Sequence, residues 1–229
     1  MSEPLVVTSV PGSGTIFTLR LLESHPQIPI RIGCDGGNIK DFKKLLPIIE
    51  NNNLSNHLLN EFSNSQYLLL YGHIHYDWMR QLLSNDFNYK LIIPIRHPLS
   101  VWRTIKKRNQ IKSIRPLVLY SYLLNILLSI QKEKSHLILP IDLMNKVSGE
   151  QRLVEIKYGL TKVLNLDSTQ KMIKIIRKWQ PVNVNKSLCN SNPNQSIKPL
   201  IKKLNKLGIP YGNSPEEPIG TFTFNDFLE

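Results

Sequence analysis

Near the N-terminus, a hydrophobic run, a glycine-rich turn and an amphipathic stretch follow one another directly. Leu5–Val10 (LVVTSV) predicts a buried strand and Pro11–Thr15 (PGSGT) predicts a turn. The hydrophobic residues that come next predict a helix: Phe17, Leu19, Leu21 and Leu22. A strand that enters a helix through glycines is typical of α/β folds, and the unpaired N–H groups of such a helix favour a bound anion. An ordinary tight turn with glycine punctuation is the alternative.

Beyond this segment, short β-rich runs alternate with helical stretches. Further strands are predicted at Tyr67–Tyr71, Leu91–Ile95 and Leu137–Ile141, and helices at about 41–64, 78–83, 99–112, 116–131, 149–164, 168–179 and 197–207. This alternation predicts an α/β three-layer fold with a central, mainly parallel sheet flanked by helices. One domain over residues 1–229 is expected, with about 210–229 as a loosely held C-terminal tail.

Three local features add expectations to this outline. Pro94 lies inside the third predicted strand, and because proline cannot donate a ladder hydrogen bond, it predicts a bulge or an edge position. The run Asn51–Asn53 predicts a surface loop that breaks the helical stretch 41–64. The Asn-rich segment 181–193 is also predicted to be a loop.

The formal net charge of +12 predicts attraction to anions such as nucleotides, anionic glycans, lipid headgroups or nucleic acid, although a generic basic surface is an alternative. Aromatic and basic residues are not interleaved, so no nucleic-acid partner is expected. Cys34 and Cys189 form neither a disulfide framework nor a metal-ligand spacing. With no leader-like N-terminal pattern and no bilayer-length apolar run, the chain is expected to be cytoplasmic and not membrane-spanning.

The glycine turn contains the residue types of a phosphate-binding loop. Gly12 and Gly14 allow close approach of the backbone, Ser13 and Thr15 can add hydroxyl donors, and Ile16 opens the helix whose N–H groups face the anion. The turn does not match G-x-x-x-x-G-K-[ST], because no lysine follows its second glycine. This argues against an ordinary ATPase or kinase, in which that lysine reaches the terminal phosphates.

Pro11–Gly14 (PGSG), then Phe17 and Arg20–Glu23 (RLLE), resemble the 5′-phosphosulfate loop of sulfotransferases, some of which carry P-G-S-G-N-T-W followed by R-x-L-L-E. The resemblance implies a P-loop-type fold and the binding of 3′-phosphoadenosine 5′-phosphosulfate (PAPS) by this loop. Many members have Lys or Arg where this chain has Gly12, and that cation contacts the bridging oxygen or the sulfuryl group. Ile16 and Phe17 stand where the family usually has Thr and Trp.

A second anion-binding position is predicted where the third strand ends. Arg96 would lie at the carboxyl end of the strand, where parallel sheets bind ligands, and its guanidinium is a planar fork for phosphate oxygens. Arg96 and Thr104 resemble the 3′-phosphate site of sulfotransferases, in which an Arg that closes a strand and a Ser or Thr eight positions later share one phosphate. Lys186, in a stretch that resembles the family's N-x-S segment, is a further candidate for that phosphate, with an ordinary surface lysine as the alternative. The basic residues near Thr104 are predicted to form a solvated helix face: Arg103, Lys106, Lys107 and Arg108.

His73 and His75 follow the second predicted strand, and in an extended segment they share one face. Sulfuryl transfer to a hydroxyl needs a base, and histidine suits that role. One of the two histidines can act as the base while the other positions the acceptor. Sulfotransferases often place a histidine at the end of this strand, so the resemblance favours His73 as the base. A pair of loop histidines with structural hydrogen bonds is the alternative, and a metal site would need a third ligand that the sequence does not indicate. Asp142 belongs to a family-like acidic element and is expected to be structural.

The function expected from this resemblance is transfer of a sulfuryl group from PAPS to the hydroxyl or amine of a small-molecule or glycan acceptor. No metal is expected. A P-loop nucleotide kinase or NTPase is one alternative. A non-catalytic module that kept the anion pocket is another, and Gly12 in place of the usual cation supports it. The acceptor and the oligomeric state are left open by the sequence.

Overall fold

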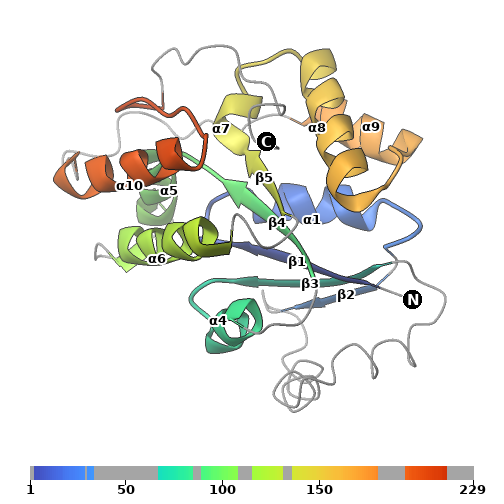
Figure 1. Ribbon diagram of the computed structural model, residues 1–229. Coiled ribbons are helices and arrows are strands. Elements are labelled where there is room, and N and C mark those ends of the chain that lie inside the picture. Colours follow the sequence, from blue (N-terminus) through green and yellow to red (C-terminus); the bar gives the residue numbers. More distant parts are fainter. Residues whose placement is uncertain are drawn as a thin grey trace.

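The computed structural model describes residues 3–28, 30–33, 67–84, 89–107, 115–130, 136–179 and 194–215. These residues form a five-stranded sheet in the order β2-β3-β1-β4-β5, in which every pair of neighbours is parallel (Figure 1). The strands are β1 (Glu3–Ser9), β2 (Ile30–Gly33), β3 (Tyr67–His73), β4 (Lys90–Ile95) and β5 (His136–Pro140).

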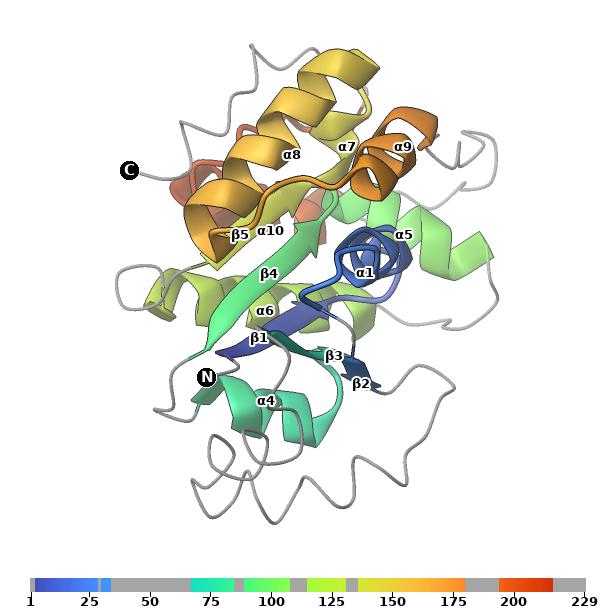
Figure 2. The same ribbon diagram turned by 90° about the vertical axis from the view of Figure 1, so that its right-hand side faces the viewer.

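Helices cover both faces of the sheet. They are α1 (Thr15–Glu23), α4 (Asp77–Ser84), α5 (Pro98–Lys107), α6 (Arg115–Ile130), α7 (Ile141–Met144), α8 (Gly149–Leu164), α9 (Gln170–Lys178) and α10 (Asn194–Lys206). One group consists of α1, α8 and α9, and the other of α5, α6 and α10 (Figure 1 and Figure 2). Right-handed crossovers explain this division, because the chain leaves β1 toward one edge through α1 and later moves toward the other edge through α4 and α6.

The hydrophobic core runs through the central strands. Leu5, Val6 and Val7 of β1 are fully buried, as are Leu91 and Ile92 of β4. A parallel strand covered by helices on both faces needs apolar side chains on both sides, which is why these segments read as continuous hydrophobic runs rather than alternating ones. None of the helices in the described ranges is long and apolar enough to cross a membrane.

The predicted three-layer α/β architecture is confirmed, together with the first strand and helix and the strands that begin near residues 67, 91 and 137. The edge strand β2 was not predicted. It has four residues, and its sequence IRIG includes a charged side chain and a glycine, so it lacks the hydrophobic run that marks the other strands. The predictions for 41–64, for residues 108–112 of the basic helix and for 181–193 concern segments outside the described residues.

The expectation for Pro94 is wrong with respect to an edge position. β4 lies between β1 and β5, so it is an interior strand. The physical reason is that the ladder between β1 and β4 joins Leu5–Val7 to Lys90–Ile92 and does not extend to Pro94, which pairs only with Leu139 of β5. Proline is therefore tolerated at a position of an interior strand where only one of the two neighbouring strands is still paired with it.

The arrangement of the strands fixes where a ligand can bind. β1 is central, with β3 on one side and β4 on the other, and the chain leaves β1 toward the β2 edge but leaves β4 toward β5. Ligands of parallel α/β sheets bind beyond the carboxyl ends of the strands at such a switch point. The residues that end these strands are Ser9, His73 and Ile95, and Arg96 follows directly.

Candidate functional site

The loop between β1 and α1 has a backbone suited to an anion. Gly12 and Gly14 have φ angles of 85° and 100°, a left-handed region that glycine adopts without strain. Gly14 is also the N-cap of α1, so the N–H groups of the helix's first turn open from the loop. A Cβ atom at Gly14 would lie 2.8 Å from Cγ1 of Ile141, which makes this a position for glycine alone. The loop can thus approach an oxyanion with backbone N–H groups and no intervening side chain.

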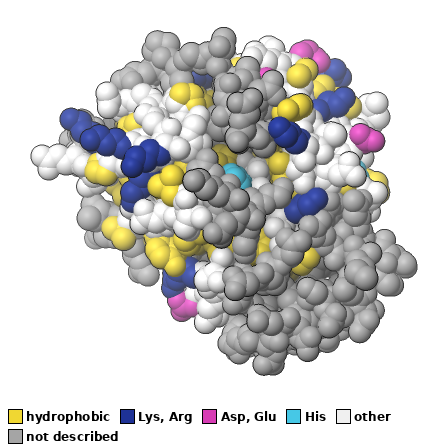
Figure 3. Space-filling view, in the orientation of Figure 1, with side chains coloured by type: hydrophobic (Ala, Val, Ile, Leu, Met, Phe, Trp, Pro, Cys, Tyr) yellow, Lys and Arg dark blue, Asp and Glu magenta, His cyan; other side chains and the backbone are white. Residues whose placement is uncertain are grey.

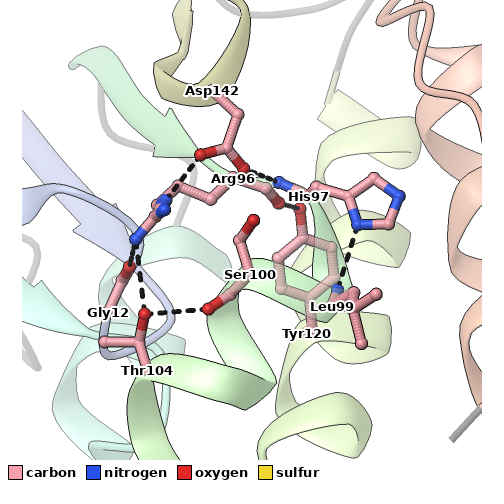
Figure 4. A network of polar contacts seen from close by, with 8 residues as sticks. All are labelled: Gly12, Arg96, His97, Leu99, Ser100, Thr104, Tyr120 and Asp142. Carbon is pink, nitrogen blue, oxygen red and sulfur yellow. Dashed lines mark hydrogen bonds and ion pairs between the residues drawn. The ribbon is translucent and has the colours of Figure 1, made fainter. Parts of the chain in front are cut away.

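Arg96 reaches from the end of β4 toward this loop. Its Nε donates to Asp142 Oδ1 at 2.9 Å, and both side chains are largely buried, with 13% and 8% of their surfaces exposed. Its Nη1 lies 3.4 Å from the carbonyl oxygen of Gly12 and 3.4 Å from Thr104 Oγ1 (Figure 4). Within the described part of the chain, Nη2 makes no hydrogen bond. The outer nitrogens of the guanidinium are therefore anchored beside the loop, and they remain available to a ligand.

Asp142 and Tyr120 fix the backbone on either side of this guanidinium. Asp142 Oδ2 accepts from the N–H of His97 at 2.8 Å, and the Tyr120 hydroxyl donates to the carbonyl oxygen of Arg96 (Figure 4). Burial raises the pKa of Tyr120 well above its ordinary value, with a further contribution from Asp142, so the phenol stays a donor. Asp142, which the sequence indicated only as structural, is thus the residue that orients Arg96.

His73, at the end of β3, lies beside Ser9, at the end of β1, and the two residues pair in the parallel ladder. Ser9 Oγ lies 3.2 Å from His73 Nδ1 and 2.5 Å from Thr15 Oγ1, and all three side chains are buried. The rings of His73 and His75 are stacked, with centroids 5.7 Å apart and planes 25° apart. A chain of polar atoms therefore joins the first residue of α1 to the candidate base.

These groups line one cavity of about 1100 Å³. Its wall includes eight of the residues predicted from the sequence, namely Gly12, Gly14, Thr15, Ile16, His73, His75, Arg96 and Thr104. Ser13 is not on the wall; it is buried, and its Oγ has no hydrogen-bond partner among the described residues. Lys186 lies outside the described residues. The structure thus brings the loop, the strand ends and Thr104 of α5 together around one cavity.

The sequence did not connect α9 with this site. Lys171 and Lys178 line the cavity from α9, and Arg20 lines it from α1. Among the described residues, they and Arg96 give the wall four Lys or Arg side chains, and Glu23 is the acidic residue on it. Lys171 and Lys178 are seven positions apart and so share one face of a helix, but this spacing does not reveal what the face meets. The cavity is therefore electropositive and suits a ligand with several negative charges.

The aromatic side chains Phe17 and Trp179 form an apolar part of the wall, with ring centroids 4.6 Å apart. Arg152 lies against the Trp179 ring, its Cζ 5.0 Å from the ring centroid. The buried guanidinium of Arg152 donates to four carbonyl oxygens, those of Met144, Val147, Ile176 and Trp179. Burial also lowers the pKa of Arg152. Trp179 is consequently held in place from behind the cavity.

Lys and Arg side chains are widely spread over the face seen in Figure 3, where Asp and Glu side chains are few. Arg103, from the basic helix α5, is not among the residues that line the cavity. No group of three His, Cys, Asp or Glu side chains within the described ranges could hold a metal ion.

Neither the models of known protein families nor the curated proteins gave a match to this sequence. The function must therefore be inferred from the residues of the site.

Proposed function

We propose that this chain is a sulfotransferase that moves a sulfuryl group from PAPS to the hydroxyl or amine of a small-molecule or glycan acceptor. The observation that supports the proposal is a convergence in space: the glycine loop, the Arg96–Thr104 pair and His73 are far apart in the sequence and line the same cavity. PAPS carries two anionic groups, and the cavity has two neighbouring sets of donors at the carboxyl edge of the sheet, the loop N–H groups and the Arg96–Thr104 pair.

Different groups of residues bind different parts of the donor substrate. Backbone N–H groups of the loop and the first turn of α1 bind the 5′-phosphosulfate, where Gly12 and Gly14 leave room for close approach. Arg96 and Thr104 bind the 3′-phosphate through the guanidinium nitrogens and the hydroxyl. The cationic side chains on α1 and α9 offset the remaining negative charge.

The proposed reaction needs a base and charge stabilisation. His73 accepts the proton of the acceptor hydroxyl as the acceptor oxygen forms its bond to sulfur. The bond between sulfur and the bridging oxygen of the 5′-phosphate breaks, and adenosine 3′,5′-bisphosphate is the leaving group. Loop N–H groups stabilise the charge that develops on that phosphate, so positioning and electrostatics supply most of the rate enhancement, as in phosphoryl transfer.

The residue at position 12 determines which groups stabilise the negative charge that develops on the 5′-phosphate. It stands where many sulfotransferases have a cation, and its Cβ position lies 3.2 Å from Thr104 Cγ2, so the loop passes close against α5. The charge on the leaving phosphate is then met by backbone N–H groups of the loop and of the first turn of α1.

Calorimetric titration of adenosine 3′,5′-bisphosphate into the purified protein tests the donor site. We expect binding without magnesium, and weaker binding of adenosine 5′-phosphate. In Arg96→Ala, the loss of charge-assisted hydrogen bonds, worth about 1.5–3 kcal/mol, should weaken the bisphosphate by at least about tenfold. Adenosine 5′-phosphate should be affected far less. Equal weakening of both ligands would contradict the assignment of Arg96 to the 3′-phosphate.

Turnover is tested with labelled PAPS and a panel of hydroxyl and amine acceptors. His73→Ala should abolish transfer and leave the affinity for the bisphosphate nearly unchanged. His136→Ala is the matched control, because His136 begins β5 at the amino end of the sheet, away from the site. ATP binding that depends on magnesium would instead favour the kinase or NTPase alternative. Selective bisphosphate binding with no transfer to any acceptor would favour the non-catalytic module.

A further inference from the structure

The polar chain that links Thr15, Ser9 and His73 has a direction. Ser9 Oγ lies between Thr15 Oγ1 at 2.5 Å and His73 Nδ1 at 3.2 Å. Ser9 has one hydroxyl proton, so it can donate to one of these neighbours and must accept from the other. All three side chains are buried, Ser9 completely, so water does not readily replace either hydrogen bond.

Two arrangements of protons satisfy the hydrogen bonds that join Thr15, Ser9 and Nδ1 of His73. In the first, Thr15 donates to Ser9, Ser9 donates to His73 Nδ1, and the neutral imidazole carries its proton on Nε2. In the second, His73 Nδ1–H donates to Ser9, Ser9 donates to Thr15, and the Thr15 proton is directed elsewhere. The number of protons is the same in both, and the imidazole proton moves from Nε2 to Nδ1 by exchange with solvent.

The second arrangement requires an acceptor for the Thr15 proton. Thr15 is the first residue of α1 and lines the cavity beside the loop, so an anion held by the loop supplies that acceptor. A phosphate oxygen accepts and does not donate in its ionised form. An anion in the loop therefore favours the arrangement in which Nε2 of His73 has an unprotonated lone pair.

We propose that Ser9 is a positioning residue that couples occupancy of the phosphate loop to the tautomer of His73. The inference rests on the proposed function only in taking the loop as an anion site and His73 as the base. His73 becomes a base at Nε2 when the donor substrate is bound. Without it, Thr15 can instead donate to Ser9 and Ser9 to Nδ1, which places the ring proton on Nε2, where the ring cannot accept a proton. Ser9 thereby orders the two substrates, because acceptor activation follows donor binding.

Long-range ¹H–¹⁵N correlation spectra of the histidine side chains, recorded where the ring is neutral, test the coupling. The signals of His73 are assigned with His73→Asn. We expect adenosine 3′,5′-bisphosphate to shift the wild-type ring from the Nε2–H to the Nδ1–H pattern. Ser9→Ala should bind the bisphosphate within a few-fold of wild type but lose the tautomer response. Its transfer rate should fall by about 10²-fold, the scale of one acid–base contribution, and Ser9→Thr should restore both.

Thr8→Val is the matched control, because Thr8 is also fully buried on β1 but points to the other face of the strand. It should keep the wild-type response. Inorganic phosphate at high concentration serves as a second probe. A response to phosphate but not to the bisphosphate would keep the coupling and overturn the sulfotransferase. If the bisphosphate binds and the His73 pattern is unchanged, or if Ser9→Ala responds like wild type, the coupling is overturned while the proposed donor site stands. A wild-type chain that responds to neither probe also overturns it.

Discussion

Asp142 holds Arg96 by accepting from its Nε at 2.9 Å, and with its second oxygen it accepts from the next residue's backbone N–H at 2.8 Å. One carboxylate therefore fixes both the side chain and the backbone at the end of β4. Because Nε is used in this pair, the guanidinium can rotate little and its outer nitrogens keep one direction. This is the form of preorganisation that a phosphate site needs, since a mobile arginine would lose conformational entropy on binding.

Asp142→Asn tests this anchor. The substitution leaves the largely buried charge of Arg96 without a counter-ion, so we expect the free energy of unfolding to fall by about 3 kcal/mol. The affinity for adenosine 3′,5′-bisphosphate should fall as well. Chemical unfolding and calorimetry measure the two effects. Asp77→Asn is the control, because Asp77 pairs with Arg80 at the surface with 86% of its side chain exposed. A similar loss of stability in both variants would contradict the anchoring role.

Gly14→Ala should damage the loop without removing any functional group. The new Cβ would lie 2.8 Å from Ile141 Cγ1, at a φ of 100° that alanine rarely adopts. A loss of about 1–3 kcal/mol in stability, with loss of bisphosphate binding, is expected. Gly149→Ala, at the start of α8, meets no atom within 4 Å and should be neutral or slightly stabilising. Thermal unfolding of the pair distinguishes strain at the loop from a general effect of losing glycine.

Arg152→Met should show how strongly the cavity wall depends on a buried cation. The variant keeps an unbranched apolar stem and leaves four carbonyl oxygens without their donor. Because each unsatisfied buried acceptor costs about 1–3 kcal/mol, a loss of several kcal/mol is expected, together with a change in the fluorescence of Trp179. Arg177→Met removes an exposed ion pair with Glu150 and is the control. Unchanged stability in Arg152→Met would show that water replaces the guanidinium.

The buried tyrosines predict a loss of stability in alkali. Burial raises the pKa of Tyr89 to about 12, and it raises those of Tyr120 and Tyr211 well above 10.0. Above pH 10 the unfolded chain loses tyrosine protons that the native state keeps, so the unfolded state binds fewer protons. The contribution to stability is complete below about pH 10 and then falls by about 1.4 kcal/mol per pH unit for each tyrosine. Urea unfolding between about pH 9 and pH 11.5 measures the slope, which Tyr89→Phe should reduce; a flat wild-type profile would contradict the prediction.

Much of the fold could be predicted from the sequence because hydrophobic runs and glycine turns are local signals. β1 and its loop are specified by adjacent residues, and the continuous apolar pattern of β4 reflects burial on both faces. The short edge strand β2 has no such pattern, since its pairing with β3 depends on backbone hydrogen bonds more than on its side chains. The position of Pro94 was predicted wrongly because the sequence of β4 alone does not show where its pairing with β1 ends. That pairing stops at Ile92, before Pro94.

Residues of the candidate site could be predicted from the sequence where they follow the ends of predicted strands. Arg96 and His73 satisfy this condition, so a parallel sheet brings them together. Ser9 was not singled out in the sequence, and Asp142 was expected only to be structural, because their roles depend on contacts with residues distant in the chain. Lys178 was missed for a related reason: its helix packs against α1, and helix–helix packing is not encoded in a single spacing.

The long sequence separations inside the site bear on how the protein is made. Ser9 and His73 are 64 positions apart, Gly12 and Arg96 are 84 apart, and Arg96 and Asp142 are 46 apart. Contacts of this range form slowly, because chain closure must precede the gain in contact energy. During synthesis, the loop and Arg96 leave the ribosome well before Asp142, so the nascent chain holds an unanchored arginine until β5 and α7 emerge. A ligand that requires the whole site would bind only after the sheet is complete, and by mass action it would then favour the finished fold over every intermediate.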